Sequence, residues 1–160
     1  MKINEAPLTM IDGRETTFGE FKDKVVMVVN VASRCGLSPQ YEALEELHKK
    51  YKDKGFTVLG LPSNQFLQEL SSEEKISEYC STTWGVTFPI TEKVKVNGKG
   101  AHPLYQELTS HKEVKGKSGR IKWNFEKFVI LPKGEVHRFS PTTNPDDPEI
   151  VNLIESNLDD

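Results

Sequence analysis

The feature that most constrains the fold is a buried strand, a helix and a second buried strand in direct succession. Val25–Val31 is an almost uninterrupted apolar run rich in valine, typical of a strand that is covered on both faces and central in its sheet. An amphipathic helix is predicted to begin at Ser38-Pro39, with Ser38 as its N-cap, and to end at Lys54-Gly55. Residues 56–61 form the next buried strand. Because a right-handed crossover joins such strands in parallel, Cys35 is expected at the carboxyl end of the central strand.

The remaining segments predict further strands and helices around this unit. Ser71 and Glu74 have the spacing of a capping box at the start of a second helix. That helix is expected to end just past Cys80, because β-branched residues, Gly and Pro follow. The other predicted elements are a hairpin with strands at 8–10 and 16–18, a helix at 101–108, strands at 125–131 and Val136–Phe139, and a helix at 148–158. We therefore predict an α/β fold with a central mixed β-sheet flanked by helices on both faces, in a single domain spanning residues 1–160.

Composition and charge exclude several classes of protein. The net charge of -3 gives no general attraction to nucleic acid, and we expect no nucleic-acid partner. No segment has the roughly 18 uninterrupted apolar residues of a membrane span or the apolar core of a signal peptide, so we expect a cytoplasmic protein without stable membrane insertion. The two cysteines and four scattered histidines form no metal-ligand pattern, and we predict neither a metal site nor a cofactor.

The position of Cys35 favours thiol chemistry over a purely structural role. A cysteine in the turn between a buried strand and a helix faces the positive end of the helix dipole and unpaired backbone amides, and Arg34 adds a cation. Gly36 is expected to leave the thiol open to a ligand. Because Ser38 stands where a Cys-x-x-Cys motif would have its second cysteine, the turn lacks a local dithiol. A single thiolate here suits attack on a peroxide oxygen, which gives a sulfenic acid that a second thiol must recycle. The alternative is an inert cysteine that fills core space.

Several motifs resemble the glutathione peroxidase family in its cysteine-containing form. The resemblance covers the chain from about Glu5 to the last helix, in order and spacing. The matching segments are 30–36 (NVASRCG), 62–66 (PSNQF), 80–89 (CSTTWGVTFP), 96–99 (VNGK), 102–105 (HPLY), 123–128 (WNFEKF) and 141–143 (PTT). The resemblance implies a thioredoxin-like fold and reduction of hydrogen peroxide and of organic or lipid hydroperoxides.

The resemblance also implies a catalytic tetrad, which maps onto Cys35, Gln68, Trp123 and Asn124. An indole N–H and two carboxamides are neutral donors that can hold a thiolate and a peroxide oxygen without adding a competing base. The loop around Gln68 is one residue shorter than in family members and lacks two glycines that they commonly carry. Gln65 is therefore an alternative to Gln68. Without the resemblance, Trp123 would be interpreted as a core residue and Asn124 as a turn residue.

Cys80 is similar in position to the resolving cysteine of the thioredoxin-dependent branch of the family. The implied cycle is a sulfenic acid at Cys35, a disulfide with Cys80, and reduction by thioredoxin, with glutathione as the other possible reductant. The alternative is a core cysteine beside Ile76 and Tyr79. If Cys80 starts buried on a helix, it must reach Cys35 by local unwinding, which the poor helix formers after it favour.

Two other functions are compatible with these residues. One is a redox relay that passes the disulfide to a client protein, and the other is a thioredoxin-like binding module with inert cysteines. The chain lacks an insertion present in tetrameric relatives, which implies a monomer. A basic stretch is interpreted as a solvated loop, although it could attract phospholipid head groups or an acidic reductant; it comprises Lys112, Lys115, Lys117, Arg120 and Lys122.

Overall fold

The valine-rich run forms the central strand of the protein in the computed structural model, which describes residues 3–67, 69–110 and 119–158. Strand β3 (Val25–Val31) leads through helix α1 (Gln40–Tyr51) to strand β4 (Phe56–Pro62), and β3 pairs with β4 in parallel. Every residue of both strands is buried. The predicted strand, helix and parallel strand are confirmed.

The other elements surround this unit. They are η1 (Ile3–Glu5), β1 (Pro7–Thr9), β2 (Glu15–Thr17), η2 (Phe18–Phe21), η3 (Lys52–Lys54), α2 (Glu73–Trp84), α3 (Pro103–Leu108), β5 (Lys127–Ile130), β6 (Val136–Phe139) and α4 (Pro148–Glu155). Strands β1 and β2 form the predicted hairpin. None of the described helices is long and apolar enough to cross a membrane.

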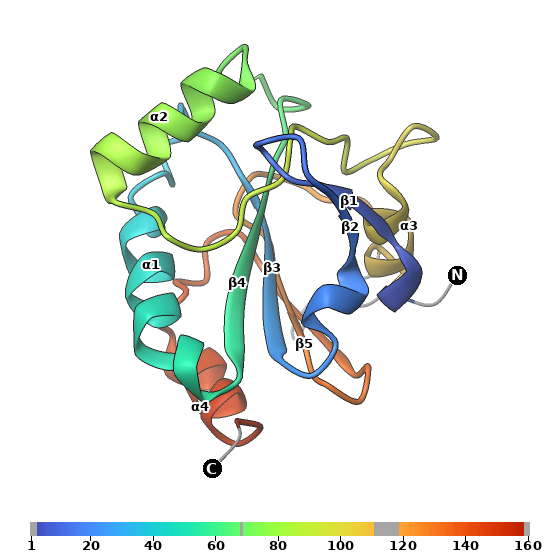
Figure 1. Cartoon of the computed structure of the whole chain (residues 1–160), viewed down its shortest axis with the longest axis vertical. Helices are drawn as coiled ribbons and strands as arrows, with labels where there is room; N and C mark the ends of the chain where they lie inside the picture. Colours follow the sequence, from blue (N-terminus) through green and yellow to red (C-terminus); the bar gives the residue numbers. More distant parts are fainter. Residues whose placement is uncertain (1–2, 68, 111–118, 159–160) are drawn as a thin grey trace.

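The central sheet is mixed and covered on both faces, as predicted. Its strand order is β4-β3-β5-β6, with β5 antiparallel to both β3 and β6. Helices α1, α2 and α4 lie on one side, while the β1–β2 hairpin and α3 lie on the other (Figure 1). Alternate residues of β3 point into the two apolar cores that result, Met27 and Val29 into one and Val26 and Val28 into the other.

The predicted N-cap of α1 is wrong. The helix begins at Gln40, no side chain caps it, and the hydroxyl of Ser38 instead donates a hydrogen bond to the carbonyl of Ala32 at 2.8 Å. Ser38 thus closes the turn that carries Cys35 onto the end of β3. The other end agrees with the sequence, because η3 extends α1 and Gly55 terminates it in the left-handed region at φ 94°.

Helix α2 differs from the prediction at both ends. Its N-cap is Ser72, one residue after the predicted Ser71, and the Ser72 hydroxyl accepts a hydrogen bond from the first turn. The helix continues to Trp84, past its predicted end, because the Trp84 indole donates to the Tyr79 hydroxyl at 3.0 Å and holds the last turn. Gly85, at φ 62°, then ends the helix.

The remaining differences are at element ends. Helix α3 begins at Pro103, because His102 caps it by accepting a hydrogen bond from the backbone of the first turn, and α4 ends at Glu155. Strand β5 begins at Lys127, two residues after its predicted start. The cause is Phe125, whose φ of 68° turns the backbone away from a strand.

Candidate active site

A short turn between β3 and α1 carries Cys35. The carbonyl of Cys35 accepts a hydrogen bond from the backbone N–H of Ser38 at 2.9 Å, and the Ser38 hydroxyl anchors the turn on Ala32. The turn lies at the carboxyl end of the central strand, where the sequence predicted it. Beside the thiol, the α-carbon of Gly36 faces open space, with no heavy atom within 4 Å of a Cβ added there.

Two N–H groups point at the sulfur of Cys35. The indole Nε1 of Trp123 donates to Sγ at 3.1 Å, and the backbone N–H of Leu37 donates to it at 3.4 Å. Hydrogen bonds of this kind stabilise negative charge on sulfur. The predicted association of Cys35 with Trp123 is therefore present in the structure.

Cys35 is more buried than the sequence suggested. A strand-to-helix turn was expected to expose the thiol, but Cys35 is only 5% exposed because it belongs to the core on the α1 side of the sheet. The exposed member of the pair is Trp123, at 38%. Its indole also contacts the ring of Phe66, with centroids 5.3 Å apart. The indole of Trp123, and not the thiol, is therefore the part of this pair that faces solvent.

Asn124, the next residue of the predicted tetrad, is completely buried. Neither its Oδ1 nor its Nδ2 has a hydrogen-bond partner among the described residues. An unpartnered buried carboxamide costs roughly 1–3 kcal/mol, so such groups are rare and call for an explanation. A carboxamide with both functions free can bind a thiolate or a peroxide oxygen, which is the role that the family resemblance implies for Asn124.

The two candidate glutamines differ in what the structure shows. Gln68 lies outside the described residues. The amide of Gln65 is engaged with backbone: its Oε1 accepts from Val96 and Asn97, the latter at 2.9 Å, and its Nε2 donates to the carbonyl of Asn97 at 3.1 Å. This engagement argues against Gln65 as the group that assists Cys35 and leaves Gln68 as the candidate.

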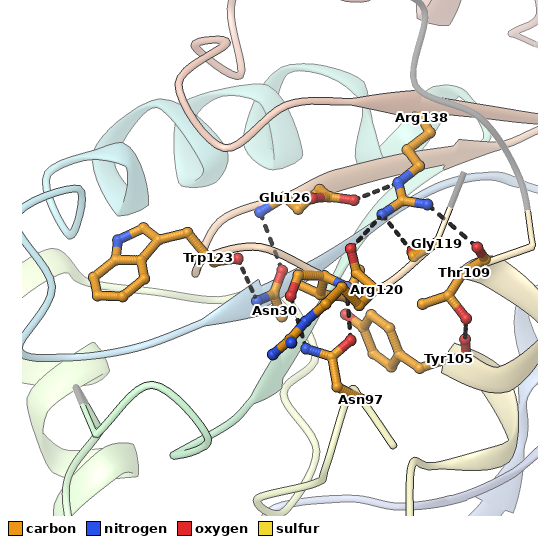
Figure 2. Close-up of polar contacts among 10 residues, drawn as sticks. Asn30, Asn97, Tyr105, Thr109, Gly119, Arg120, Trp123, Glu126 and Arg138 are labelled. Carbon is orange, nitrogen blue, oxygen red and sulfur yellow. Dashed lines mark hydrogen bonds and ion pairs between the residues drawn. The ribbon is translucent and has the colours of Figure 1, made fainter. Parts of the chain in front are cut away.

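Asn30, a buried residue of β3, holds the segment that carries Trp123 and was not predicted from the sequence. Its Nδ2 donates to the carbonyl of Trp123 at 3.0 Å, and its Oδ1 accepts from the N–H of Glu126 at 3.0 Å (Figure 2). A polar residue within a strand of seven otherwise apolar buried residues was the signal that could have identified it.

Glu69 was also missed. This carboxylate is 5% exposed, and its Oε1 accepts from the backbone N–H groups of Ser33, at 2.9 Å, and Leu70, at 2.8 Å. Burial raises the pKa of Glu69, and the hydrogen bonds from Ser33 and Leu70 oppose the rise. Because Ser33 is two residues before Cys35, Glu69 fixes the start of the turn that carries Cys35.

Cys80 is a free thiol at 2% exposure on the buried face of α2. Burial raises the pKa of Cys80 to about 11, and the nearby Tyr41 hydroxyl only partly opposes that rise. Ile76 and Cys80 are the only fully buried residues of α2, and Tyr79 and Trp84 pack against the core while partly buried. In this position burial disfavours the thiolate form of Cys80.

Among the described residues, no three His, Cys, Asp or Glu side chains lie together in a group that could hold a metal ion. The groups directed at the sulfur of Cys35 are the neutral N–H donors of Trp123 and Leu37. A thiol at the carboxyl end of a central strand, with an indole N–H directed at its sulfur, defines a redox protein that uses one attacking thiol.

Comparisons with known proteins identify the family. The glutathione peroxidase family model matches residues 3–109. The glutathione peroxidase homolog BsaA of Halalkalibacterium halodurans is 51% identical over 147 residues, covering 91% of this chain and 93% of that protein. The thioredoxin/glutathione peroxidase BtuE of Escherichia coli is 47% identical over 165 residues, covering 90% of each. The crystal structure of T. cruzi GPX1 has a TM-score of 0.77 at 34% identity and covers 98% of this chain and 96% of its own.

This chain belongs to the glutathione peroxidase family and is a thiol peroxidase. Its thioredoxin-like fold, which the resemblance implied, is confirmed.

Proposed function

We propose that this peroxidase reduces hydroperoxides through a sulfenic acid at Cys35, which Cys80 resolves and thioredoxin recycles. The observation that carries the proposal is the hydrogen bond from Trp123 Nε1 to Cys35 Sγ at 3.1 Å. This bond directs a neutral donor at the sulfur that must carry negative charge. The sulfur belongs to the turn that follows the central strand.

In the first step, the Cys35 thiolate attacks the terminal oxygen of the hydroperoxide. The S–O bond forms as the O–O bond breaks, and the alkoxide takes up a proton and leaves as an alcohol, or as water when the substrate is hydrogen peroxide. Trp123, Asn124 and Gln68 are the proposed donors to the thiolate and to the oxygen that develops charge. The free carboxamide of Asn124 supports this role, because it has both a donor and an acceptor available.

In the second step, the sulfur of Cys80 attacks the sulfenic sulfur, the disulfide forms, and hydroxide leaves with the Cys80 proton as water. Local unwinding of α2 serves this step in two ways. It carries Cys80 toward the turn, and it returns the thiol to water, where its pKa falls from about 11 toward an ordinary value. Unwinding therefore both delivers the resolving thiol and activates it.

The reductant comes third. Thioredoxin would reduce the disulfide by supplying two thiols and becoming a disulfide itself, and glutathione is the second candidate. The name of the Escherichia coli relative includes both reductants. We also propose that the protein works in the cytoplasm, where thiols are kept reduced. We also propose that the chain acts as a monomer, without a nucleic-acid partner and without stable membrane insertion.

The test combines turnover with mass spectrometry. Wild type, Cys35→Ser and Cys80→Ser are supplied with thioredoxin, thioredoxin reductase and NADPH, and peroxide consumption is followed. We expect no turnover with Cys35→Ser, and with Cys80→Ser one oxidation without thioredoxin-driven cycling. One equivalent of peroxide should link Cys35 to Cys80 in the wild type. Equal multiple-turnover rates in the Cys80→Ser variant would falsify the two-cysteine scheme, and a wild type that stalls after one oxidation would favour the redox relay.

A further inference from the structure

The segment that carries Trp123 has no regular secondary structure between Gly119 and Glu126. Three side chains from other parts of the chain, those of Asn30, Asn97 and Arg138, form hydrogen bonds with its backbone. Asn97 exchanges two hydrogen bonds with Ile121, at 2.6 and 2.7 Å. Arg138 donates to the carbonyl of Gly119 at 2.9 Å (Figure 2). The position of the indole is therefore set by side-chain contacts, since no helix or strand defines it.

Asn30 makes the contacts closest to Trp123. Its side chain spans the segment, donating to the carbonyl of Trp123 and accepting from the N–H of Glu126, both at 3.0 Å. Its backbone carbonyl accepts from Phe125 N–H at 2.6 Å. Figure 2 shows the indole pointing away from this network. Three hydrogen bonds from one buried residue thus fix the backbone from which the indole projects.

The hydrogen bonds of Asn30 begin directly after the last residue pair between β3 and β5. The last pair between β3 and β5 joins Val29 to Lys127, and Asn30 is the next residue of β3. Beyond that pair, the chain leaves the sheet through Phe125, whose φ of 68° is unfavourable for a bulky residue. A strained backbone persists only when its surroundings hold it, and the side chain of Asn30 supplies that restraint.

We propose that Asn30 is a positioning residue that holds the Trp123 indole against the Cys35 thiol and thereby sets the rate of attack on the hydroperoxide. The inference rests on the proposed function of Cys35 and Trp123. Asn30 is completely buried, and both atoms of its carboxamide form hydrogen bonds with backbone groups. It therefore acts through Trp123 and does not touch the substrate. A displacement of the indole by about 1 Å is enough to break its hydrogen bond to the thiolate.

The test is the variant Asn30→Leu, which keeps the volume and removes both side-chain hydrogen bonds. The second-order rate of Cys35 oxidation by hydrogen peroxide, measured by stopped flow, is expected to fall about 10- to 100-fold. In a Trp84→Phe background, Trp123 is the only tryptophan, and its emission should respond to oxidation when Asn30 is present and lose that response in Asn30→Leu. The matched control is Thr57→Val, which removes a buried hydrogen bond in the adjacent strand and should leave both signals unchanged.

A double-mutant comparison separates positioning from a general loss of stability. If Asn30 acts through Trp123, Asn30→Leu should slow a Trp123→Phe enzyme little further. A normal oxidation rate in folded Asn30→Leu, or a full additional loss in the Trp123→Phe background, overturns the inference. Should Asn30→Leu not fold, Asn30→Ala takes its place, because it removes the same bonds without adding apolar bulk.

The two proposals fail in distinguishable ways. If Cys35→Ser still consumes peroxide, or if Trp123→Phe oxidises at the wild-type rate, the proposed function of these residues fails and the role of Asn30 falls with it. If both of those variants are impaired while Asn30→Leu is normal, only the role of Asn30 is overturned.

Discussion

The indole Nε1 of Trp123 donates to the sulfur of Cys35 at 3.1 Å, although the two residues are 88 positions apart in the sequence. Cys35 is placed by the end of the central strand, and Trp123 by side chains that clamp an irregular segment. The site thus combines a thiol held by regular secondary structure with a donor held by tertiary contacts. Changes in the donor segment should therefore affect chemistry more than folding.

Replacing Trp123 with phenylalanine tests this donor. The variant removes the N–H directed at Sγ while keeping an aromatic ring against Phe66. Hydrogen bonds to charged groups contribute about 1.5–3 kcal/mol, so we expect Cys35 oxidation to slow by about 10- to 100-fold. Because Trp123 is 38% exposed, the free energy of unfolding should change by less than about 1 kcal/mol. Stopped-flow oxidation and urea unfolding measure the two quantities.

The matched control for this substitution is Trp84→Phe. It also removes an indole N–H, but this one donates to the hydroxyl of Tyr79 instead of to Sγ. It should leave the first oxidation unchanged. If the two variants slow oxidation equally, the effect of Trp123 is not due to its hydrogen bond with the sulfur.

Stabilising α2 should slow resolution. Thr82 and Thr83 are exposed on this helix, and replacing both with alanine raises helix propensity by about 1 kcal/mol in total. If Cys80 must leave the helix to reach Cys35, formation of the disulfide should slow by about fivefold. The first oxidation should not change. Rapid quenching followed by mass spectrometry measures both steps after one equivalent of peroxide.

The control is Asn152→Ala, which raises helix propensity at an exposed position of α4. This variant should stabilise the protein without altering the rate of resolution. An unchanged rate in the Thr82→Ala, Thr83→Ala double variant would mean that Cys80 meets Cys35 while its helix remains intact.

Glu69 predicts a pH dependence of stability. Burial raises its pKa in the folded protein, so the folded state holds its proton more tightly than the unfolded state does. This contribution to stability is present below the ordinary pKa of 4.5 and is lost as the pH rises through the folded pKa. Glu69→Gln, which cannot ionise, should therefore gain stability relative to wild type as the pH rises above about 4.5. Urea unfolding at a series of pH values measures this difference.

Glu69→Ala provides the contrast. It leaves the N–H groups of Ser33 and Leu70 without their acceptor and, because neither variant ionises, should be roughly 2–4 kcal/mol less stable than Glu69→Gln at every pH. A pH-independent difference between wild type and Glu69→Gln would show that the carboxyl group titrates alike in both states.

The parts of the fold that follow from local pattern could be predicted from the sequence. The run Val25–Val31 and the amphipathic residues after it carry their periodicity in consecutive positions, so β3, α1 and the location of Cys35 were evident. Resemblance added Trp123, Asn124 and Cys80, whose roles no local pattern reveals. The fold class is confirmed, whereas the catalytic roles remain predictions.

The parts that depend on distant contacts could not be predicted. Serine is a common N-cap residue, but the hydroxyl of Ser38 donates its hydrogen bond to the carbonyl of Ala32, because the chain folds back on β3. Helix α2 continues through residues of low helix propensity to Trp84, since Trp84 contacts Tyr79 and stacks on Tyr41 at a centroid distance of 6.4 Å. The function of Asn30 is set by a segment more than 90 residues away. In each case, a tertiary contact outweighs the local preference.

Lys127 predicts a second pH dependence, of opposite sign to that of Glu69. Its ammonium group is completely buried in β5 and donates to the carbonyls of Pro141, at 2.8 Å, and Thr143. Burial lowers the pKa of Lys127 from 10.5 to about 7, and the charge of Glu126 only partly opposes the fall. Between pH 7 and 10.5 the unfolded chain therefore binds more protons than the folded one, and stability from this group rises with pH.

Comparison with Lys127→Met isolates this effect, because methionine is similar in size and does not titrate. In a Cys35→Ser, Cys80→Ser background, where no thiol ionises, wild-type Lys127 should gain stability relative to methionine as the pH rises from 7 toward 10.5. A shift from 10.5 to about 7 corresponds to a gain on the order of 5 kcal/mol. Urea unfolding at several pH values measures it. A constant difference would show that water reaches Lys127 in the folded protein and that the group titrates as it does in the unfolded chain.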